Sequence, residues 1–210
     1  LALMIIYLHG FSSSSASNKA GVFKRALAGT RFVILDYPAH RPHAAVSSIT
    51  RAITRASSAS PDEGVTLMGS SLGGFYARFL AATLDLVENV VMINPALQPQ
   101  ITLKPYIGLN TNMVTGQPFE FGQQDYADLV AYDIGSEPHV KPTLVLLDEG
   151  DEVIDYRVAA RVYAAAGRVR VYPGGSHRFE HIDEAMPEIR RFIAAPEKNG
   201  FCMRRLERLQ

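Results

Sequence analysis

Short apolar runs alternate with segments typical of helices along almost the whole chain of 210 residues. The apolar runs are continuous, as expected for parallel strands that helices cover on both faces. Strands are predicted near 3–8, 31–35, 64–69, 89–93, 142–148 and 168–172, and helices near 18–28, 43–58, 72–85, 155–166 and 182–194. This alternation predicts an α/β fold, with right-handed crossovers and a doubly wound, mostly parallel sheet of about six strands.

Residues 96–140 break the alternation, because they carry Pro, Gly, Asn and Gln with scattered aromatics and no long periodic run. A connection of that length is usually functional. It lies at the carboxyl edge of the predicted sheet, where open α/β sheets bind ligands. We therefore expect a short cap or pocket wall inside a single domain of residues 1–195. Residues 196–210, with three arginines, form a separate tail, expected to be docked on the surface or frayed.

Composition narrows the classes of partner. The chain has 21 basic residues (Lys and Arg) and 21 acidic residues (Asp and Glu). Because these charges balance, the composition indicates neither a nucleic-acid partner nor disorder. The single Cys202 excludes an intrachain disulfide, and the six histidines show no metal-ligand spacing. Residues 1–8 are apolar but too short to cross a bilayer, and they lack the basic start and cleavage site of a signal peptide. We expect a soluble, cytoplasmic protein with no membrane partner, cofactor or metal.

The most informative motif is Gly69-Ser70-Ser71-Leu72-Gly73, which stands between a predicted strand and a predicted helix. This is the G-x-S-x-G pattern in the strand–turn–helix context that it needs. Ser71 must sit at the tip of a strained turn, and the flanking glycines relieve the crowding that Cβ atoms would cause there. The amino end of the next helix favours a developing oxyanion. The motif predicts that Ser71 is a nucleophile.

A serine hydroxyl needs a base that takes its proton and an acid that orients the base. In this fold the order along the chain is Ser, then Asp or Glu, then His. His177 fits best as the base, since it follows the last predicted strand in a glycine-rich loop. The other histidines fit less well: His181 is expected inside the next helix, His40 and His43 follow the second strand, His139 lies in the insertion, and His9 precedes Ser71.

The acid is expected after the fifth strand, where the chain has an unusual cluster of carboxylates. Asp151 is favoured because it stands just past the turn residue Gly150. Asp148 and Glu152 are the alternatives. A solvated acidic turn is the expected role of Glu149, and also of Glu152 if it is not the acid.

An oxyanion hole needs a second N–H group beside that of the residue after the nucleophile. Leu72 supplies the first. Phe11 is the predicted source of the second, because His9-Gly10-Phe11 follows the first strand directly and Gly10 lets the backbone turn there without steric cost.

Six segments together resemble a known family. They are Leu8-His-Gly-Phe-Ser-Ser, Gly69-Ser-Ser-Leu-Gly-Gly-Phe-Tyr76, Ile93-Asn-Pro-Ala96, Thr115-Gly-Gln-Pro-Phe119, Gly150-Asp-Glu-Val-Ile-Asp-Tyr156 and Gly174-Gly-Ser-His177. The chain resembles the YqiA-like esterases, small bacterial serine hydrolases of the α/β-hydrolase superfamily. This resemblance implies a minimal fold without the first antiparallel strands, and a triad of Ser71, Asp151 and His177. It also implies esterase or thioesterase activity on acyl substrates, acyl-CoA included.

Two features depart from the family pattern. Leu147-Asp148-Glu149 adds acids ahead of the Gly-Asp-Glu-Val turn, and the basic tail extends beyond the last family helix.

The sequence therefore predicts a serine esterase or thioesterase that acts on small-molecule acyl substrates through an acyl-enzyme on Ser71. Two alternatives remain: a peptidase or amide hydrolase of the same fold, and a non-catalytic ligand-binding protein on a hydrolase scaffold. Acyl length and leaving group depend on the pocket that residues 96–140 build, and the oligomeric state has no signature in the sequence.

Overall fold

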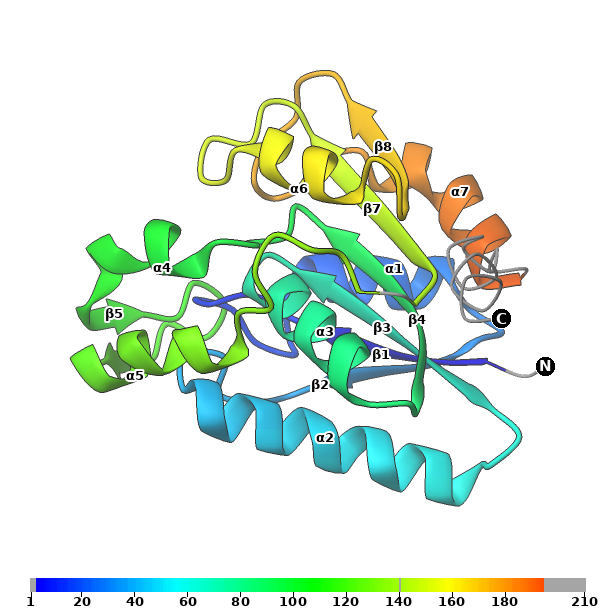
Figure 1. Cartoon of the computed structure of the whole chain (residues 1–210), viewed down its shortest axis with the longest axis horizontal. Coiled ribbons are helices and arrows are strands. Elements are labelled where there is room, and N and C mark those ends of the chain that lie inside the picture. Colours follow the sequence, from blue (N-terminus) through cyan, green and yellow to red (C-terminus); the bar gives the residue numbers. More distant parts are fainter. Residues whose placement is uncertain (1–2, 140, 195–210) are drawn as a thin grey trace, which may run out of the picture.

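The computed structural model describes residues 3–139 and 141–194. Their centre is a sheet of six strands in the order β2-β1-β3-β4-β7-β8, in which every neighbouring pair is parallel (Figure 1). The strands are β1 (Leu3–Leu8), β2 (Arg31–Leu35), β3 (Gly64–Ser70), β4 (Val87–Ile93), β7 (Thr143–Asp148) and β8 (Arg168–Tyr172). The predicted six-stranded parallel α/β sheet is confirmed.

Helices cover both faces of this sheet. They are α1 (Asn18–Ala26), α2 (Pro42–Ala59), α3 (Leu72–Thr83), α6 (Tyr156–Tyr163) and α7 (Ile182–Ala194). Alternate side chains of each strand point to opposite faces. Along β1, Ile6 belongs to the core cluster that contains the apolar residues of α2, α3 and α6, whereas Tyr7 belongs to the cluster that contains those of α1 and α7. The sheet therefore separates two cores (Figure 1).

Element boundaries differ from the predicted ones by up to three residues. The side chain of Asp155 accepts a hydrogen bond from the Arg157 N–H at 3.0 Å and caps α6, as its position predicts. That helix ends at Tyr163 instead of residue 166, because the Gly167 N–H turns back to the Tyr163 carbonyl at 2.9 Å. No helix among the described residues is both long and apolar enough to cross a membrane. The predicted tail, with Cys202, lies outside the described residues.

Residues 96–140 contain short elements where no periodic run was expected. β5 (Gly108–Thr111) and β6 (Pro118–Phe121) form an antiparallel hairpin, and around it lie α4 (Pro99–Thr102), η1 (Lys104–Tyr106), α5 (Gln123–Asp128) and η2 (Leu129–Tyr132). Phe121 and Leu129 are buried in the core cluster on the α2–α3 side. This cap lies beyond the carboxyl ends of the central strands, at the left of Figure 1.

Candidate active site

The predicted site residues follow the carboxyl ends of neighbouring strands. In a parallel sheet these ends meet at one edge, so residues far apart in the sequence are brought together there. His9 to Phe11 follow β1, Ser71 follows β3, Asp151 follows β7 and His177 follows β8.

Ser71 stands at a strained turn between β3 and α3. Its φ of 54° and ψ of −121° lie in a region that residues other than glycine rarely adopt. A Cβ atom on Gly69 would lie 2.3 Å from the Gly73 carbonyl oxygen, and one on Gly73 would lie 2.2 Å from the Leu8 carbonyl oxygen. Both positions therefore require glycine, as the motif predicts, and the turn is fixed by close backbone packing.

Ser71, His177 and Asp151 form a hydrogen-bonded chain. The Ser71 Oγ lies 3.0 Å from Nε2 of His177, and Nδ1 of that ring lies 2.9 and 3.0 Å from the two carboxylate oxygens of Asp151. The Asp151 side chain is 1% exposed, and its Oδ1 also accepts the N–H groups of Val153 and Ile154. An ionised carboxylate only accepts hydrogen bonds, so this geometry puts the ring proton on Nδ1 and leaves Nε2 to accept the serine proton.

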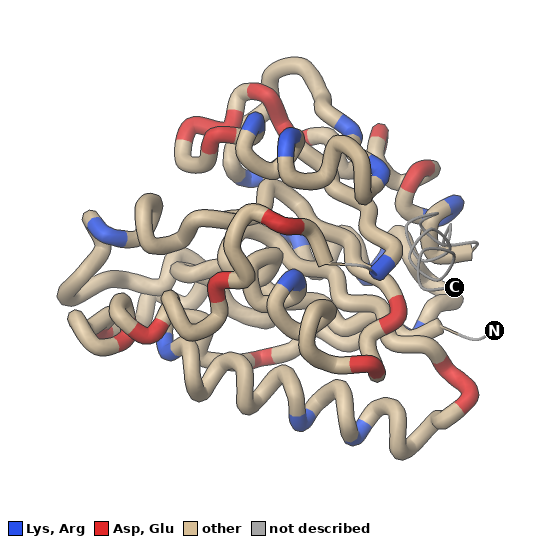
Figure 2. The backbone as a smooth tube through the Cα atoms, viewed as in Figure 1, with Lys and Arg blue, Asp and Glu red and all other residues tan. Residues whose placement is uncertain are grey.

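The alternative acids make other contacts. Glu152 accepts the backbone N–H of His177 at 2.9 Å, and this hydrogen bond lowers the pKa of the Glu152 carboxyl. Asp148 is fully buried and bonds Nδ1 of His181 at 2.8 Å. Neither carboxylate bonds the ring of His177 among the described contacts. Figure 2 shows how acidic residues gather on the loop between β7 and α6.

The other histidines contact other groups. His9 is buried and its Nδ1 lies 2.9 Å from the Gly10 carbonyl, His40 packs on Phe119, His43 pairs with Asp128, and His139 is buried beside Thr143. Burial lowers the pKa of His9, His40 and His139, the last to about 4.

The loop after β1 lies directly against Ser71. A Cβ atom on Gly10 would lie 3.1 Å from Cβ of Ser71 and 3.5 Å from its Oγ. The backbone N–H groups of Phe11 and Leu72 have no acceptor among the described residues. The Tyr37 hydroxyl donates to the His9 carbonyl at 2.6 Å and holds the start of this loop. Both N–H groups predicted for the oxyanion hole are therefore available at the same edge of the sheet.

The cap holds this loop from the other side. The Asn112 amide donates to the Ser13 carbonyl at 2.8 Å, and the next residue's N–H donates to the Ser12 carbonyl at 2.9 Å. The Phe11 ring packs edge-to-face on Phe119 at a centroid distance of 5.3 Å. The β5–β6 hairpin thus fixes the segment that carries the predicted Phe11 N–H.

Asn94 is a residue of the site that the sequence prediction did not single out. It has a φ of 41°, and its side chain is buried between two loops. Its Nδ2 donates to the Ser176 carbonyl at 3.0 Å, and its Oδ1 accepts the Asp148 N–H at 2.9 Å. Its only sequence signal was its place in the family segment Ile93-Asn-Pro-Ala96.

Lys19 lies behind the nucleophile, on the α1 side of the sheet, and no sequence pattern indicated it. Its Nζ donates to the Ser70 hydroxyl at 2.8 Å. Burial lowers the pKa of the Lys19 ammonium to about 8, although the charges of Asp151 and Asp148 act in the opposite direction. The site therefore has an ammonium close to its two buried carboxylates.

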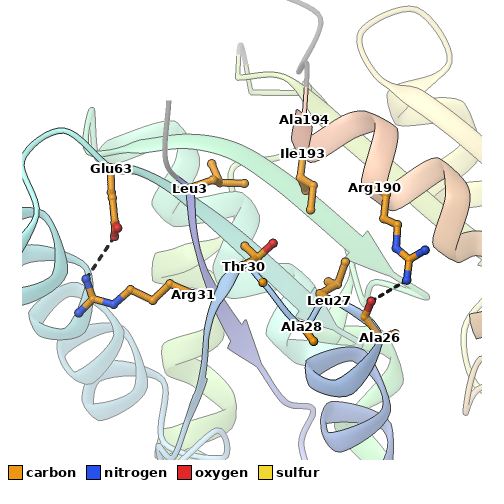
Figure 3. A pocket seen from close by; sticks show the side chains of 11 residues that line it. Leu3, Ala26, Leu27, Ala28, Thr30, Arg31, Glu63, Arg190, Ile193 and Ala194 are labelled. Carbon is orange, nitrogen blue, oxygen red and sulfur yellow. Dashed lines mark hydrogen bonds and ion pairs between the residues drawn. The ribbon is translucent and has the colours of Figure 1, made fainter.

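Within the described residues, no group of three or more His, Cys, Asp and Glu side chains could hold a metal ion. A cavity of about 610 Å³ lies at the amino ends of β1 and β2, at the edge opposite Ser71 (Figure 3). Its lining includes the Arg31–Glu63 ion pair at 3.2 Å and the contact of Arg190 with the Ala26 carbonyl. This cavity is separate from the candidate active site.

Comparison with known proteins confirms the family resemblance. The sequence model of the family described as "Uncharacterised protein family (UPF0227)" matches residues 4–194. A UPF0227 protein of Serratia proteamaculans is 24% identical over 193 residues, which cover 92% of this chain and all of that protein. The UPF0227 protein YcfP of Salmonella newport is 24% identical over 191 residues, which cover 90% of this chain and 98% of that protein.

Similar solved structures have the α/β-hydrolase fold. Est1E from Butyrivibrio proteoclasticus matches with a TM-score of 0.72 and 16% identity over 92% of this chain and 87% of that one. The Pyrococcus furiosus esterase Pf2001 matches with a TM-score of 0.67 and 13% identity over 91% and 81%. At this identity the likeness establishes the fold alone, and the predicted α/β-hydrolase fold is confirmed.

Proposed function

The chain belongs to the UPF0227 family, and we propose that it is a serine hydrolase that cleaves carboxylic esters or thioesters. The observation that carries the proposal is the chain of contacts from the Ser71 hydroxyl through the His177 ring to the buried Asp151 carboxylate, at 3.0 and 2.9 Å. A nucleophile, a base within hydrogen-bond reach and an orienting acid are the groups that acyl transfer needs.

In the first half of the proposed reaction, Nε2 of His177 takes the Ser71 proton while Oγ attacks the acyl carbonyl carbon. The resulting oxyanion would accept the N–H groups of Leu72 and Phe11. His177 then gives its proton to the departing alcohol or thiol, the bond from carbonyl carbon to leaving group breaks, and the acyl group stays on Ser71. Asp151 stabilises the imidazolium throughout without becoming protonated.

The second half repeats these steps with water. His177 takes a proton from water, the hydroxide oxygen bonds to the acyl carbon, and the same N–H groups stabilise the second oxyanion. The bond to Ser71 then breaks, and His177 returns the proton to Oγ. The products are a carboxylic acid and the free enzyme, so no cofactor takes part in the proposed reaction.

The aromatic residues of the cap favour a substrate with an apolar acyl group. The Phe11 ring, next to the proposed oxyanion hole, packs at 5.8 Å from Tyr106 and at 5.3 Å from Phe119. Aromatic side chains beside the reacting carbonyl suit hydrocarbon better than charged substituents. The Pyrococcus furiosus protein Pf2001, with the same fold, is named as an esterase, which also favours esters over amides.

The alternative of a ligand-binding protein without catalysis is less consistent with the site. Binding alone requires neither the strained φ of 54° at Ser71 nor its contact with His177 at 3.0 Å. Strain of this kind is held at functional sites by surrounding structure, here by the close packing of Gly69 and Gly73.

A labelling experiment tests the proposed function. A fluorophosphonate probe should modify Ser71, identified by peptide mass spectrometry, and Ser71→Ala should lower turnover of p-nitrophenyl esters by about 10⁴-fold or more. Chain-length series of p-nitrophenyl and CoA esters, with a p-nitroanilide as the amide comparison, would define the substrate class. Modification at Ser70, or undiminished turnover by Ser71→Ala, would refute the assignment.

A further inference from the structure

A second aspartate–histidine pair lies next to the first. Nδ1 of His181 is 2.8 Å from Oδ1 of Asp148, whose side chain is fully buried, whereas the His181 side chain is 17% exposed. Both residues were alternatives for the proposed Ser71 site, and neither bonds Ser71 or the His177 ring among the described contacts.

Among the described residues, the side-chain hydrogen bonds of Asp148 are all with one loop, residues 173–181, which joins β8 to α7 and carries His177. Its Oδ2 accepts the N–H of Ser176 at 3.2 Å and the N–H of Glu180 at 2.8 Å, and Oδ1 bonds His181. One carboxylate therefore bonds the loop on both sides of His177.

The loop backbone is packed closely on this carboxylate. A Cβ atom on Gly175, which has a φ of 72°, would lie 2.0 Å from Oδ2 of Asp148. The ring of His181 stacks on Tyr172 with centroids 5.2 Å apart and an angle of 12° between the planes. Asn94 links the same parts, because it bonds both the Asp148 N–H and the Ser176 carbonyl.

We propose that Asp148 and His181 are a positioning pair, which fixes the loop so that His177 stays between Ser71 and Asp151. This inference rests on the proposed function, since it concerns the geometry of the proposed base. Asp148 acts as the fixed point, because it ends a central strand and its N–H is itself bonded by Asn94. His181 supplies the side-chain donor that holds the end of the loop against the Asp148 carboxylate.

The charge of Asp148 is essential to this arrangement. Three donors point at one carboxylate, and only an ionised carboxylate can accept them all with no donor of its own. In Asp148→Asn one oxygen becomes an NH₂ group that faces donors, and buried donors left unsatisfied are costly. A displacement of the base by about 1 Å is enough to slow catalysis about 100-fold.

The test compares variants matched in shape. His181→Phe keeps an aromatic ring for Tyr172 but removes the donor, whereas His181→Asn keeps an N–H at the position of Nδ1. Asp148→Asn removes the charge. Glu184→Gln, on α7, removes a carboxylate whose charge acts on His181 but which lies outside the loop, and serves as the control.

We expect kcat on a p-nitrophenyl ester to fall about 100-fold in Asp148→Asn and about tenfold in His181→Phe, with KM within about twofold of the wild type. His181→Asn should recover most of the loss, and Glu184→Gln should match the wild type. The double variant Asp148→Asn/His181→Phe should be no slower than Asp148→Asn alone, because the pair acts as a unit.

A spectroscopic readout does not depend on turnover. The proton between His177 Nδ1 and Asp151 should give a low-field NMR resonance, assigned by its absence from His177→Gln. We expect that resonance to weaken or shift in His181→Phe while the thermal unfolding curve still shows a folded protein. If Asp148→Asn fails to fold, His181→Phe and His181→Asn carry the test alone.

The outcomes separate this inference from the proposed function. Wild-type kcat and an unchanged resonance in folded His181→Phe would overturn the positioning pair, as would an equal loss in His181→Asn. If the wild type instead shows no ester turnover and no labelling of Ser71, the proposed function fails, and the resonance still reports whether the pair positions His177.

Discussion

Ser70 and Ser71 are neighbours in the sequence but have different surroundings. The Ser70 hydroxyl accepts a hydrogen bond from Lys19 at 2.8 Å behind the sheet, while the Ser71 hydroxyl lies 3.0 Å from His177 at its edge. The positive φ of Ser71 turns its side chain out of the strand's alternation. The Ser70 oxygen is engaged by the Lys19 ammonium, whereas the Ser71 hydroxyl has an imidazole within reach to take its proton, so the geometry favours Ser71 of the two as the proposed nucleophile.

The acidic residues after β7 allow a prediction about which carboxylate orients His177. Asp151→Asn keeps the shape of the side chain but removes the acceptor for Nδ1 of His177, and such a change costs about 10⁴-fold in turnover in a Ser-His-Asp site. Glu152→Gln keeps an oxygen for the His177 N–H and should cost less than about tenfold. Steady-state kinetics of both variants on one p-nitrophenyl ester measure the two losses of turnover. Near-normal turnover in Asp151→Asn would show that another acid has the role.

The turn between β3 and α3 depends on its glycines, which gives a prediction for stability. Gly73→Ala would place a methyl group 2.2 Å from the Leu8 carbonyl oxygen, so the backbone must move. We expect a loss of about 2 kcal/mol or more in the free energy of unfolding. Gly21→Ala is the matched control, because its Cβ would meet only the end of the Arg25 side chain at 3.3 Å, within α1. It should stabilise the protein by about 0.5–1 kcal/mol.

Urea denaturation of the two glycine variants measures the comparison. Equal stability of Gly73→Ala and the wild type would mean that the turn has more freedom than its packing indicates.

The β5–β6 hairpin should affect catalysis through the loop it holds. In Asn112→Asp, Oδ1 still accepts the N–H groups of Val114 and Thr115, but the donor to the Ser13 carbonyl is lost and a carboxylate faces that carbonyl instead. The Phe11 N–H should then be misplaced, and kcat should fall about tenfold. Asn110→Asp is the control, since its side chain donates only to the carbonyls of Tyr106 and Gly108 inside the cap.

Acylation rates measured by stopped-flow on both asparagine variants test the coupling. Equal rates for Asn112→Asp and Asn110→Asp would mean that the contact between the cap and the Ser13 carbonyl does not affect the proposed oxyanion hole.

Elements with a strong pattern were predictable, and those that depend on tertiary contacts were not. Buried parallel strands are continuous apolar runs, so the six strands of the main sheet could be read from the sequence. The hairpin strands have four residues each, alternate in exposure and are held by contacts of Phe121 with the core, so no periodic run marks them.

The candidate site likewise contains residues that a local sequence pattern marks and residues that only tertiary contacts bring together. Ser71 and His177 were predictable because a motif and a chain order mark them. The acidic cluster could not be divided by sequence, because Asp148 and His181 meet only after β7 and the β8–α7 loop pack together. Lys19 and Asn94 act through contacts with residues more than fifty positions away, and such contacts leave no local pattern.

At the scale of the whole molecule, the Asp148–His181 pair should make stability depend on pH. The hydrogen bond to Asp148, aided by the charges of Asp148, Glu184 and Glu180, raises the pKa of His181 above its usual value of about 6.5. Tyr172, stacked on the ring, adds no charge at neutral pH. Because the folded state holds this proton more tightly than the unfolded state, the charged pair stabilises the fold fully below the ordinary pKa. That contribution is lost as pH rises through the raised pKa.

His181→Phe measures this contribution, because it keeps the ring and removes the titrating group. The melting temperature of the wild type should be higher than that of the variant, and the difference should be larger near about pH 6 than near about pH 9, where only the neutral hydrogen bond remains. Taking the difference between two proteins at each pH removes the titration of the other histidines, which they share. A constant difference would mean that His181 has the same pKa in the folded and unfolded states, and a difference that grows with pH would mean that folding lowers its pKa. Either result would contradict a charged Asp148–His181 pair that stabilises the fold.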